Sequence, residues 1–235
     1  YQLIHLNKKS SKLLLLQRNE LLSDKQKYLR KRFGRFIFTN IFVNYFQIKD
    51  LNQRAEDLFK KEFQTFENFL PKNVNSILDI GCGLGIINIF LNQKYKNDLK
   101  FFMLDKNKID SSIKYGFSEN YESYNDLSET ENLLYANGIE KEQLNIKNVD
   151  KEIDIDLKLD LIISLKSMCY HYPLENYLYL FKKICTKNTE FILDVTAGSY
   201  FNKLTNKYFD YAKIIYEEGG IHTLKRLHCK GFRYK

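Results

Sequence analysis

Glycine is scarce in this chain, with 10 residues among 235. Three of the ten, Gly81, Gly83 and Gly85, nevertheless stand at alternate positions in the segment SILDIGCGLGIINIFL, residues 76–91. Glycine allows a backbone to turn tightly and to approach a ligand closely. The cluster therefore predicts a loop that is shaped around a bound molecule.

Cysteine is also infrequent, and its spacing argues against two kinds of stabilising site. No pair forms a CxxC motif, and none has the Cys/His spacing that is typical of zinc ligands. The four cysteines are Cys82, Cys169, Cys185 and Cys229. The sequence therefore indicates neither a disulfide framework nor a metal centre, and it favours a reducing, cytoplasmic environment.

Long hydrophobic runs are missing. The segments LLLL at 13–16 and FIFTNIFV at 36–43 are much shorter than the roughly 18 residues of a membrane-spanning helix. No signal-peptide pattern is recognisable either. We therefore expect no membrane span.

Acidic residues are outnumbered by basic ones, which gives a net charge of +8. Most lysines are spread along the whole sequence, so charge alone is weak evidence for a nucleic-acid partner. The concentrated basic run is KQKYLRKRFGR, residues 25–35. Such a run is typical of a solvated helix end or of one that faces an anionic surface. An RNA-gripping arm formed within residues 1–48 is the alternative interpretation.

The length suits one large α/β domain with an N-terminal extension. Residues 1–48 lack a strong hydrophobic period, and we expect a partly helical extension in which LLLLQRNELL, residues 13–22, is the best segment. Over residues 50–70 apolar side chains recur every three or four positions, which predicts an amphipathic helix that Pro71 ends. Residues 49–235 are expected to form the α/β domain.

Strands and helices alternate after this first helix, which predicts a Rossmann-like, doubly wound and mostly parallel sheet. Two alternating segments around Gly219-Gly220 predict a C-terminal antiparallel hairpin that closes the sheet. The parallel strands are expected at residues 76–80, 100–105, 143–149, 159–165 and 190–195.

Helices are expected between these strands, at residues 86–95, 128–139 and 174–184. Ser128 and Glu131 have the spacing of a capping box, and Asn137-Gly138 reads as the stop of the same helix. Pro173 stands at the start of the third helix, where proline is favoured.

The residues around the glycines argue against two common phosphate-binding loops. A P-loop would need a Lys-Ser or Lys-Thr pair at its end, and none follows here. The dinucleotide fingerprint GxGxxG would need a third glycine where Ile86 stands. What is present is DIGCGLG, residues 79–85, after the first strand, with Asp105 ending the second strand.

This arrangement resembles motif I, and the acidic position that follows it, of class I S-adenosylmethionine-dependent methyltransferases. The resemblance covers about residues 70–232 and includes the strand, loop and helix around the glycines and the C-terminal hairpin. It implies methyltransferase activity with S-adenosyl-L-methionine as cofactor, bound at the carboxyl ends of the parallel strands.

The resemblance also implies roles for individual residues of the glycine loop. Gly81, Cys82, Gly83 and Gly85 would lie against the methionyl part of the cofactor, and helix-start amides would face its carboxylate. Asp79 would anchor the ammonium group, directly or through water.

Two further acids are implicated on the nucleoside side of the cofactor. Asp105 would accept hydrogen bonds from the ribose 2′ and 3′ hydroxyls. Asp150 is the candidate for contact with the adenine amino group, and Asp154 and Asp156 compete for this role.

The methyl acceptor is expected beside the segment after the fourth strand, SLKSMCYHYPLENY, residues 164–177. This segment lacks the Asn/Asp-Pro-Pro-aromatic motif of amino-methylating DNA and RNA enzymes. It also lacks the Pro-Cys of cytosine-C5 enzymes, because Cys169 follows Met168. Cys169 is therefore interpreted as a small buried residue rather than a nucleophile.

His171 is the candidate catalytic residue, because its ordinary pKa suits proton removal near neutral pH. A residue that merely positions the next helix is an equal alternative. Lys166 could orient an anionic substrate or could face solvent. Tyr170 and Tyr172 flank His171 and are candidate substrate contacts.

Residues 106–127 are long for a connection between a strand and a helix, and long loops in compact domains are often functional. The aromatic residues of this segment argue against disorder. We interpret it as a lid over the acceptor pocket, with Tyr115 as a further substrate contact.

These features predict a methyltransferase that acts on oxygen, or secondarily on nitrogen, of a small-molecule or glycan-type acceptor, since aromatic side chains suit sugar or planar faces. Two alternatives stay open. One is an RNA methyltransferase that uses the basic N-terminal region. The other is a non-catalytic subunit that keeps the fold and binds a partner protein.

Overall fold

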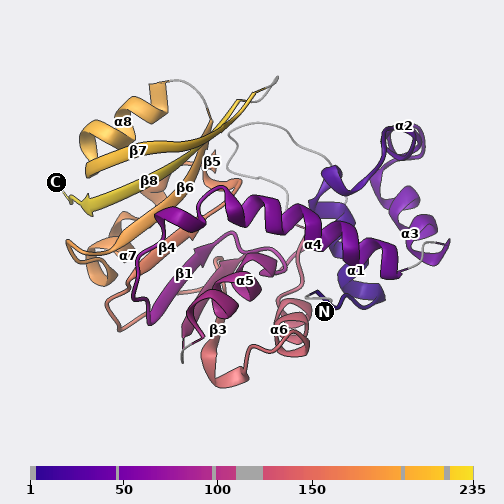
Figure 1. Ribbon diagram of the computed structural model, residues 1–235, viewed down its shortest axis with the longest axis horizontal. Helices are drawn as coiled ribbons and strands as arrows, with labels where there is room; N and C mark the ends of the chain where they lie inside the picture. Colours follow the sequence, from indigo (N-terminus) through magenta and orange to yellow (C-terminus); the bar gives the residue numbers. More distant parts are fainter. Residues whose placement is uncertain are drawn as a thin grey trace.

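The computed structural model describes residues 4–45, 48–96, 99–109, 124–196, 199–219 and 223–234. Their central feature is a seven-stranded sheet with the order β3-β2-β1-β4-β6-β8-β7 (Figure 1). The strands are β1 Ser76–Ile80, β2 Lys100–Asp105, β3 Leu144–Asn148, β4 Leu161–Ser164, β6 Glu190–Thr196, β7 Phe209–Glu218 and β8 Leu224–Phe232.

The sheet is parallel from β3 to β6, and β8 then runs antiparallel to both β6 and β7. This arrangement confirms the predicted Rossmann-like, mostly parallel sheet with a C-terminal antiparallel hairpin. Strand order reverses between β1 and β4, because β2 and β3 lie on one side of β1 and the later strands on the other. The carboxyl ends of β1 and β4 therefore form the switch point at which open α/β sheets bind ligands.

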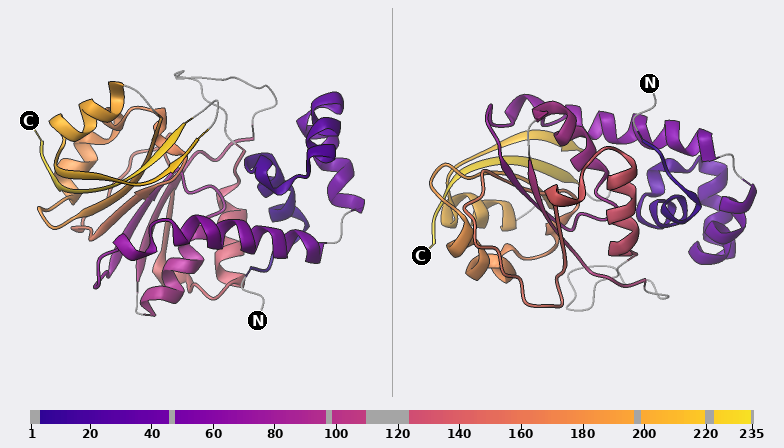
Figure 2. Two further views of the ribbon diagram at one scale, coloured as in Figure 1. Left: turned by 45° about the horizontal axis from the view of Figure 1, so that its top comes forward. Right: turned by 90° about the horizontal axis from the view of Figure 1, so that it is seen from below.

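Helices cover both faces of the sheet, as Figure 2 shows. On one face, α4 Ile48–Gln64, α5 Ile86–Tyr95 and α6 Leu127–Ala136 contribute to one hydrophobic cluster. On the other, α7 Leu178–Ile184 and α8 Ser199–Lys207 contribute to a second. Strand β1 alternates between them, since Ile77 packs in the first cluster and Leu78 in the second.

The N-terminal region is helical and is packed on the first of these layers. It consists of α1 Lys8–Gln17, a 3₁₀ turn at Asn19–Leu21, α2 Asp24–Phe33 and α3 Arg35–Tyr45. Leu13, Leu14 and Leu15 are buried in the same cluster as the helices of the α/β domain. We retain the division between residues 48 and 49 as a proposal about folding units.

The segment 13–22, expected to be the best helical stretch, is interrupted. Arg18 is extended, with φ −121° and ψ 99°, and ends α1. The backbone then turns through the 3₁₀ segment, so residues 13–22 are helical in two separate pieces. This break brings residues 17–20 to the site described below.

Three other details differ from the sequence-based expectations. Asp126, rather than Ser128, is the N-cap of α6, because its carboxylate accepts from the backbone N–H of Ser128 at 3.0 Å and of Glu129 at 3.3 Å. Ser128 already lies inside the helix, so its spacing to Glu131 was coincidental. Helix α8 and the short strand β5, Ser167–Tyr172, were not predicted.

No helix within the described ranges is both long enough and apolar enough to cross a membrane.

Candidate active site

A cavity of about 390 Å³ lies at the carboxyl ends of β1, β2 and β4. Its size is within the range of small-molecule and cofactor sites. The glycine loop forms part of its wall, the segment after β4 forms another part, and residues of the N-terminal region complete it. Candidate residues that are far apart in the sequence therefore meet in one pocket.

The glycine loop follows β1 and needs glycine for backbone conformation. Gly81, Gly83 and Gly85 have φ angles of +74°, +54° and +70°, a region that other residues rarely adopt. A Cβ on Gly81 would also overlap the side chain of Ser167, and one on Gly83 would lie 2.9 Å from Gln17 Oε1. The loop is thus packed closely between the segment after β4 and the end of α1.

The peptide groups of Gly83 are held from both sides. Its N–H donates to Asp105 Oδ2 at 2.6 Å. Its carbonyl oxygen accepts from Asn125 Nδ2 and from Thr130 Oγ1, each at 2.9 Å. Gln17 Nε2 donates to the carbonyl oxygen of Tyr124 at 2.8 Å, next to Asn125. These anchors connect the loop with β2, with the start of α6 and with α1.

Asp79 and Asp105 both line the cavity, as the sequence pattern led us to expect of neighbouring strand ends. Asp79 is buried, and Asn88 Nδ2 donates to its Oδ2 at 2.7 Å. Burial raises the pKa of Asp79 to about 7 and the pKa of Asp105 to about 6. In Asp105 the N–H groups of Gly83 and Lys106 oppose this shift because they hydrogen-bond to the carboxylate.

Two other candidate cofactor residues differ in position. Cys82 lines the cavity, and burial raises the pKa of its thiol well above the usual value, so it is a neutral, weakly polar surface. Asp150 is exposed and does not line the cavity, although its neighbour Val149 does. Its competitors Asp154 and Asp156 are exposed too, and both lie near Lys183.

The segment after β4 is folded by a buried serine. Ser164 Oγ donates to the carbonyl oxygen of Ile80 at 2.7 Å and accepts from the N–H of Met168 at 2.9 Å. Lys166 and Cys169 have positive φ angles of 53° and 68°. Residues other than glycine adopt this conformation at a cost, and such strain is concentrated at functional sites. Cys169 is buried, as predicted.

Lys166, Tyr170, His171 and Tyr172 all line the cavity. Tyr172 Oη and Ser167 Oγ are hydrogen-bonded at 2.8 Å. The His171 ring meets the Tyr170 ring edge to face, with centroids 4.8 Å apart. Desolvation lowers the pKa of His171, which favours the neutral imidazole. His171 belongs to β5, three residues before the start of the 3₁₀ turn that precedes α7.

Residues of the N-terminal region also line the cavity, and the motif analysis missed them. Gln17, Arg18 and Glu20 stand at the break after α1, and Arg35 begins α3. The Arg18 guanidinium carbon lies 5.0 Å from the centroid of the Phe59 ring on α4. No local pattern marks these residues, because their role depends on how α1 packs against the α/β domain.

A network of charged side chains fixes this part of the wall. Arg226 on β8 makes two hydrogen bonds to Asp194 on β6, each 2.7 Å long. Arg226 Nη2 also lies 3.3 Å from Glu62 Oε1, and Arg18 Nη2 lies 2.8 Å from Glu62 Oε2. Burial of Glu62 opposes ionisation, but these two guanidinium groups lower its pKa overall.

The same charge network extends to the segment after β4. Glu20 Oε1 lies 2.8 Å from Lys166 Nζ, and the N–H of Lys166 donates to Asp194 Oδ2 at 3.1 Å. The strained backbone of Lys166 is therefore fixed at its amide and at its side chain. The ring of interactions joins the N-terminal region, α4, β6, β8 and the pocket.

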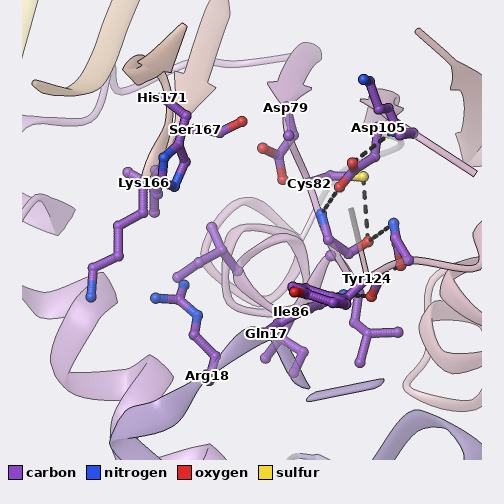
Figure 3. A pocket seen from close by; sticks show the side chains of 18 of the residues that line it. Gln17, Arg18, Asp79, Cys82, Ile86, Asp105, Tyr124, Lys166, Ser167 and His171 are labelled. Atoms are coloured by element: carbon purple, nitrogen blue, oxygen red, sulfur yellow. Dashed lines mark hydrogen bonds between the residues drawn. The ribbon is translucent and has the colours of Figure 1, made fainter. Parts of the chain in front are cut away.

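Figure 3 shows how these groups are distributed along the pocket. Asp105 lies on one side, and Lys166 and His171 lie on the opposite side. Asp79 and Arg18 lie between them. Acidic groups, a cationic group and a candidate base thus follow one another across a single cavity.

Tyr115 and most of the proposed lid lie in residues 110–123, outside the described residues. Within the parts of the chain that the structure describes, no cluster of three or more His, Cys, Asp or Glu side chains could hold a metal ion.

Sequence comparison and structural comparison give different results for this chain. No protein-family model matches the sequence, and no curated protein is significantly similar to it. Solved structures do align. A SAM-dependent methyltransferase from Leishmania major matches over 78% of this chain and 77% of its own, at 13% identity and a TM-score of 0.50.

Two further structures align at lower scores. Precorrin-6y C5,15-methyltransferase from Geobacter metallireducens aligns over 72% of this chain and 87% of its own, at 12% identity and a TM-score of 0.48. A T. thermophilus 16S rRNA methyltransferase, solved with AdoMet and guanosine, aligns over 73% of this chain at 11% identity and a TM-score of 0.47. This chain spans only 42% of that rRNA enzyme.

These identities are too low to transfer an activity, but the Leishmania alignment covers most of both chains. It agrees with the strand order, with the terminal antiparallel hairpin and with the helices on both faces of the sheet. The chain therefore has the fold of class I S-adenosylmethionine-dependent methyltransferases.

Proposed function

We propose that this chain is an S-adenosylmethionine-dependent methyltransferase that methylates an oxygen of a small-molecule or glycan-type acceptor. The observation that carries the proposal is the composition of one cavity. It joins two buried or half-buried carboxylates at adjacent strand ends, a glycine loop and, on the opposite wall, a histidine whose pKa is lowered by desolvation.

The residues present fit the chemical groups of this cofactor. Asp79 and Arg18 would face its ammonium and carboxylate groups, since both line the middle of the cavity in Figure 3. Asp105 keeps acceptor capacity beyond the bonds to Gly83 and Lys106, because each carboxylate oxygen can accept more than one hydrogen bond. That capacity suits a pair of ribose hydroxyls. When bound, the cofactor supplies a methyl group on a positively charged sulfur.

The acceptor is assigned to the wall formed by the segment after β4. Methyl transfer is an in-line displacement, so the protein mainly orients an acceptor atom, and a base helps when that atom carries a proton. We assign His171 the removal of that proton, because it lines the cavity and desolvation lowers the pKa of its imidazole. Tyr170 would support a sugar or planar face. The N-terminal residues narrow the cavity, which favours a small acceptor over a nucleic-acid helix.

The role proposed for Asp150 beside the adenine ring has to be adjusted to its position in the structure. Its side chain is exposed and outside the cavity wall, whereas Val149 lines the cavity. We therefore propose that the adenine ring packs on Val149, with Asp150 at its edge.

RNA methylation is the second candidate, because α2 carries the exposed basic residues Lys25, Lys31 and Arg32. A non-catalytic subunit is the third. Calorimetry with S-adenosylhomocysteine separates the third from the other two, because a subunit without a cofactor site would release no binding heat.

The decisive experiment is isothermal titration of S-adenosylhomocysteine into wild type, Asp105→Ala and Asp150→Ala. We expect Asp105→Ala to weaken binding about 100-fold or more, because two hydrogen bonds to a charged group are lost, each about 1.5 to 3 kcal/mol. Asp150→Ala should weaken it less than about fivefold. Equal affinities for wild type and Asp105→Ala would refute the assignment of Asp105 to the ribose.

A further inference from the structure

Helices α2 and α3 form the end of the molecule that lies away from the β7–β8 hairpin (Figure 1). This end carries an unusual concentration of exposed apolar side chains. They are Tyr28, 65% exposed, Leu29, 41%, Phe33, 51%, Ile37, 59%, and Ile41, 54%. Apolar side chains that gather in this way on one part of a surface mark an interaction site.

Helix α3 carries apolar side chains on its outer side as well as on the side that packs against the protein. Its buried face presents Phe38 and Val43 to the core, as a surface helix should. Ile37 and Ile41, one turn apart, stand on the outer side. The side of a surface helix that faces water normally carries polar residues. The outer side of α3 is therefore suited to an apolar environment.

The same two helices are strongly basic. Residues 24–45 contain six Lys and Arg residues and one acid, Asp24. Lys25, Lys31 and Arg32 are exposed. Arg30 is different, because it is buried and donates to the carbonyl oxygen of Leu15 at 2.8 Å, where it anchors α2 on α1.

We propose that the outer surface of α2 and α3 docks on an anionic lipid bilayer. Exposed aliphatic and aromatic side chains would enter the boundary between headgroups and acyl chains, and the basic residues would pair with negatively charged headgroups. RNA would pair with the same basic residues but would give Leu29, Ile37 and Ile41 no partner of their own chemistry. A second copy of the chain would bring two positive surfaces together, which is unfavourable.

The docking surface is connected to the cavity through the start of α3. Arg35 lines the cavity, and its guanidinium carbon lies 4.9 Å from the centroid of the Tyr124 ring. Phe36 contacts the same ring, with centroids 5.9 Å apart. Bilayer contact at Ile37 and Ile41 is thus only one or two helical turns from the pocket wall. The inference does not depend on the proposed methyl transfer.

The test is sedimentation of the full chain with vesicles of phosphatidylcholine alone and of phosphatidylcholine mixed with phosphatidylglycerol. We expect binding to the mixed vesicles. Lys31→Glu with Arg32→Glu should weaken it by about fivefold or more for each changed residue, since one basic residue near an anionic surface contributes about 1 kcal/mol. Ile37→Ser with Ile41→Ser should weaken it at least about tenfold.

Matched control variants lie outside α2 and α3. Lys151→Glu with Lys187→Glu makes the same change of net charge, and Tyr179→Ser removes an aromatic side chain that is 85% exposed on α7. Both controls should bind mixed vesicles within about twofold of wild type.

Three outcomes would overturn the inference. The first is no binding to mixed vesicles. The second is equal loss in the test and control variants. The third is an assay in which single-stranded RNA binds with strong salt dependence and Ile37→Ser with Ile41→Ser has no effect. Sedimentation velocity tests for self-association. A wild-type dimer that dissociates in the Ile37→Ser, Ile41→Ser variant would show that this surface binds a second copy of the chain instead of a bilayer.

Discussion

At the residue scale, the two strand-end carboxylates of the cavity, Asp79 and Asp105, have pKa values that burial has moved toward neutrality. Burial in an apolar strand favours the protonated form of Asp79, whereas the hydrogen bond from Asn88 and the charge of Arg18 favour the carboxylate. A ligand with an ammonium group would reverse this preference. The protonation state of Asp79 therefore affects both the free energy of unfolding and the affinity for such a ligand.

Asp79 makes the stability of the ligand-free protein depend on pH. Its pKa is about 7 in the folded protein and near 3.8 when unperturbed, so the folded state holds the proton more tightly. Its contribution is most favourable below about pH 4 and is lost as pH rises through about 7. Between about pH 5 and pH 8 we expect the free energy of unfolding to fall by about 2 to 3 kcal/mol on its account.

Urea unfolding of wild type and Asp79→Asn at these two pH values measures this contribution. The variant cannot ionise at this position, so its pH dependence should be flatter by about that amount. A variant with the same pH dependence as wild type would show that Asp79 is not protonated in the folded protein.

His171 should affect turnover and not cofactor binding. A general base contributes about 10² to 10⁴ in rate, so we expect His171→Gln to lower kcat by such a factor once an acceptor is known. The affinity for S-adenosylhomocysteine should stay within about twofold. His5→Gln, remote from the cavity wall, is the matched control.

A merely structural His171 would give a different pattern. The variant would then lose stability together with activity, and the acidic limb of the wild-type pH profile for kcat would persist in it. Either observation contradicts the role of base.

At the element scale, the local signals in the sequence predicted most of the sheet. Strand β1, helix α5 and strand β2 have the predicted bounds, because apolar runs, glycines and a strand-end acid all agree there. Strand β5 was missed because Lys166 and Cys169 have unusual backbone angles that no propensity reveals. The capping of α6 was misplaced because serine, aspartate and glutamate occur together at its start.

Only part of the candidate site could be predicted from the sequence, because local features identify some of its residues and not others. Asp79, Asp105 and the glycines follow from strand ends, which are local features. Arg18 and Gln17 reach the cavity because α1 breaks at Arg18 and packs on α4, and only the tertiary structure contains that information.

The charge network predicts a strong effect at one strand position. Arg226→Met would leave Asp194 and Glu62 buried with less compensation, and we expect a loss of about 3 to 5 kcal/mol. Lys225→Met on the same strand breaks a partly exposed pair with Glu217 and should cost no more than about 1 kcal/mol. Urea denaturation of both variants measures the difference.

Similar stabilities of the two β8 variants would mean that the network contributes little beyond ordinary surface pairing. The expected large difference would instead show that the buried charge network stabilises the folded protein.

At the scale of the whole molecule, the N-terminal helices and the α/β domain share one hydrophobic cluster and one charge network. The cavity is built at their junction, since its wall includes both Gly83 and Gln17. The fold is that of class I methyltransferases, while the helices α2 and α3 present the surface that we assign to an anionic bilayer.

The central claim is that this cavity receives a sulfonium nucleoside with its sugar at Asp105 and its amino-acid end between Asp79 and Arg18. A crystal structure of the chain grown with S-adenosylhomocysteine tests it most directly. We predict ribose hydroxyls within hydrogen-bond distance of the Asp105 carboxylate, and the homocysteine part along the glycine loop. A structure in which the compound is absent from the cavity at saturating concentration, or lies there with its sugar away from Asp105, would contradict the account.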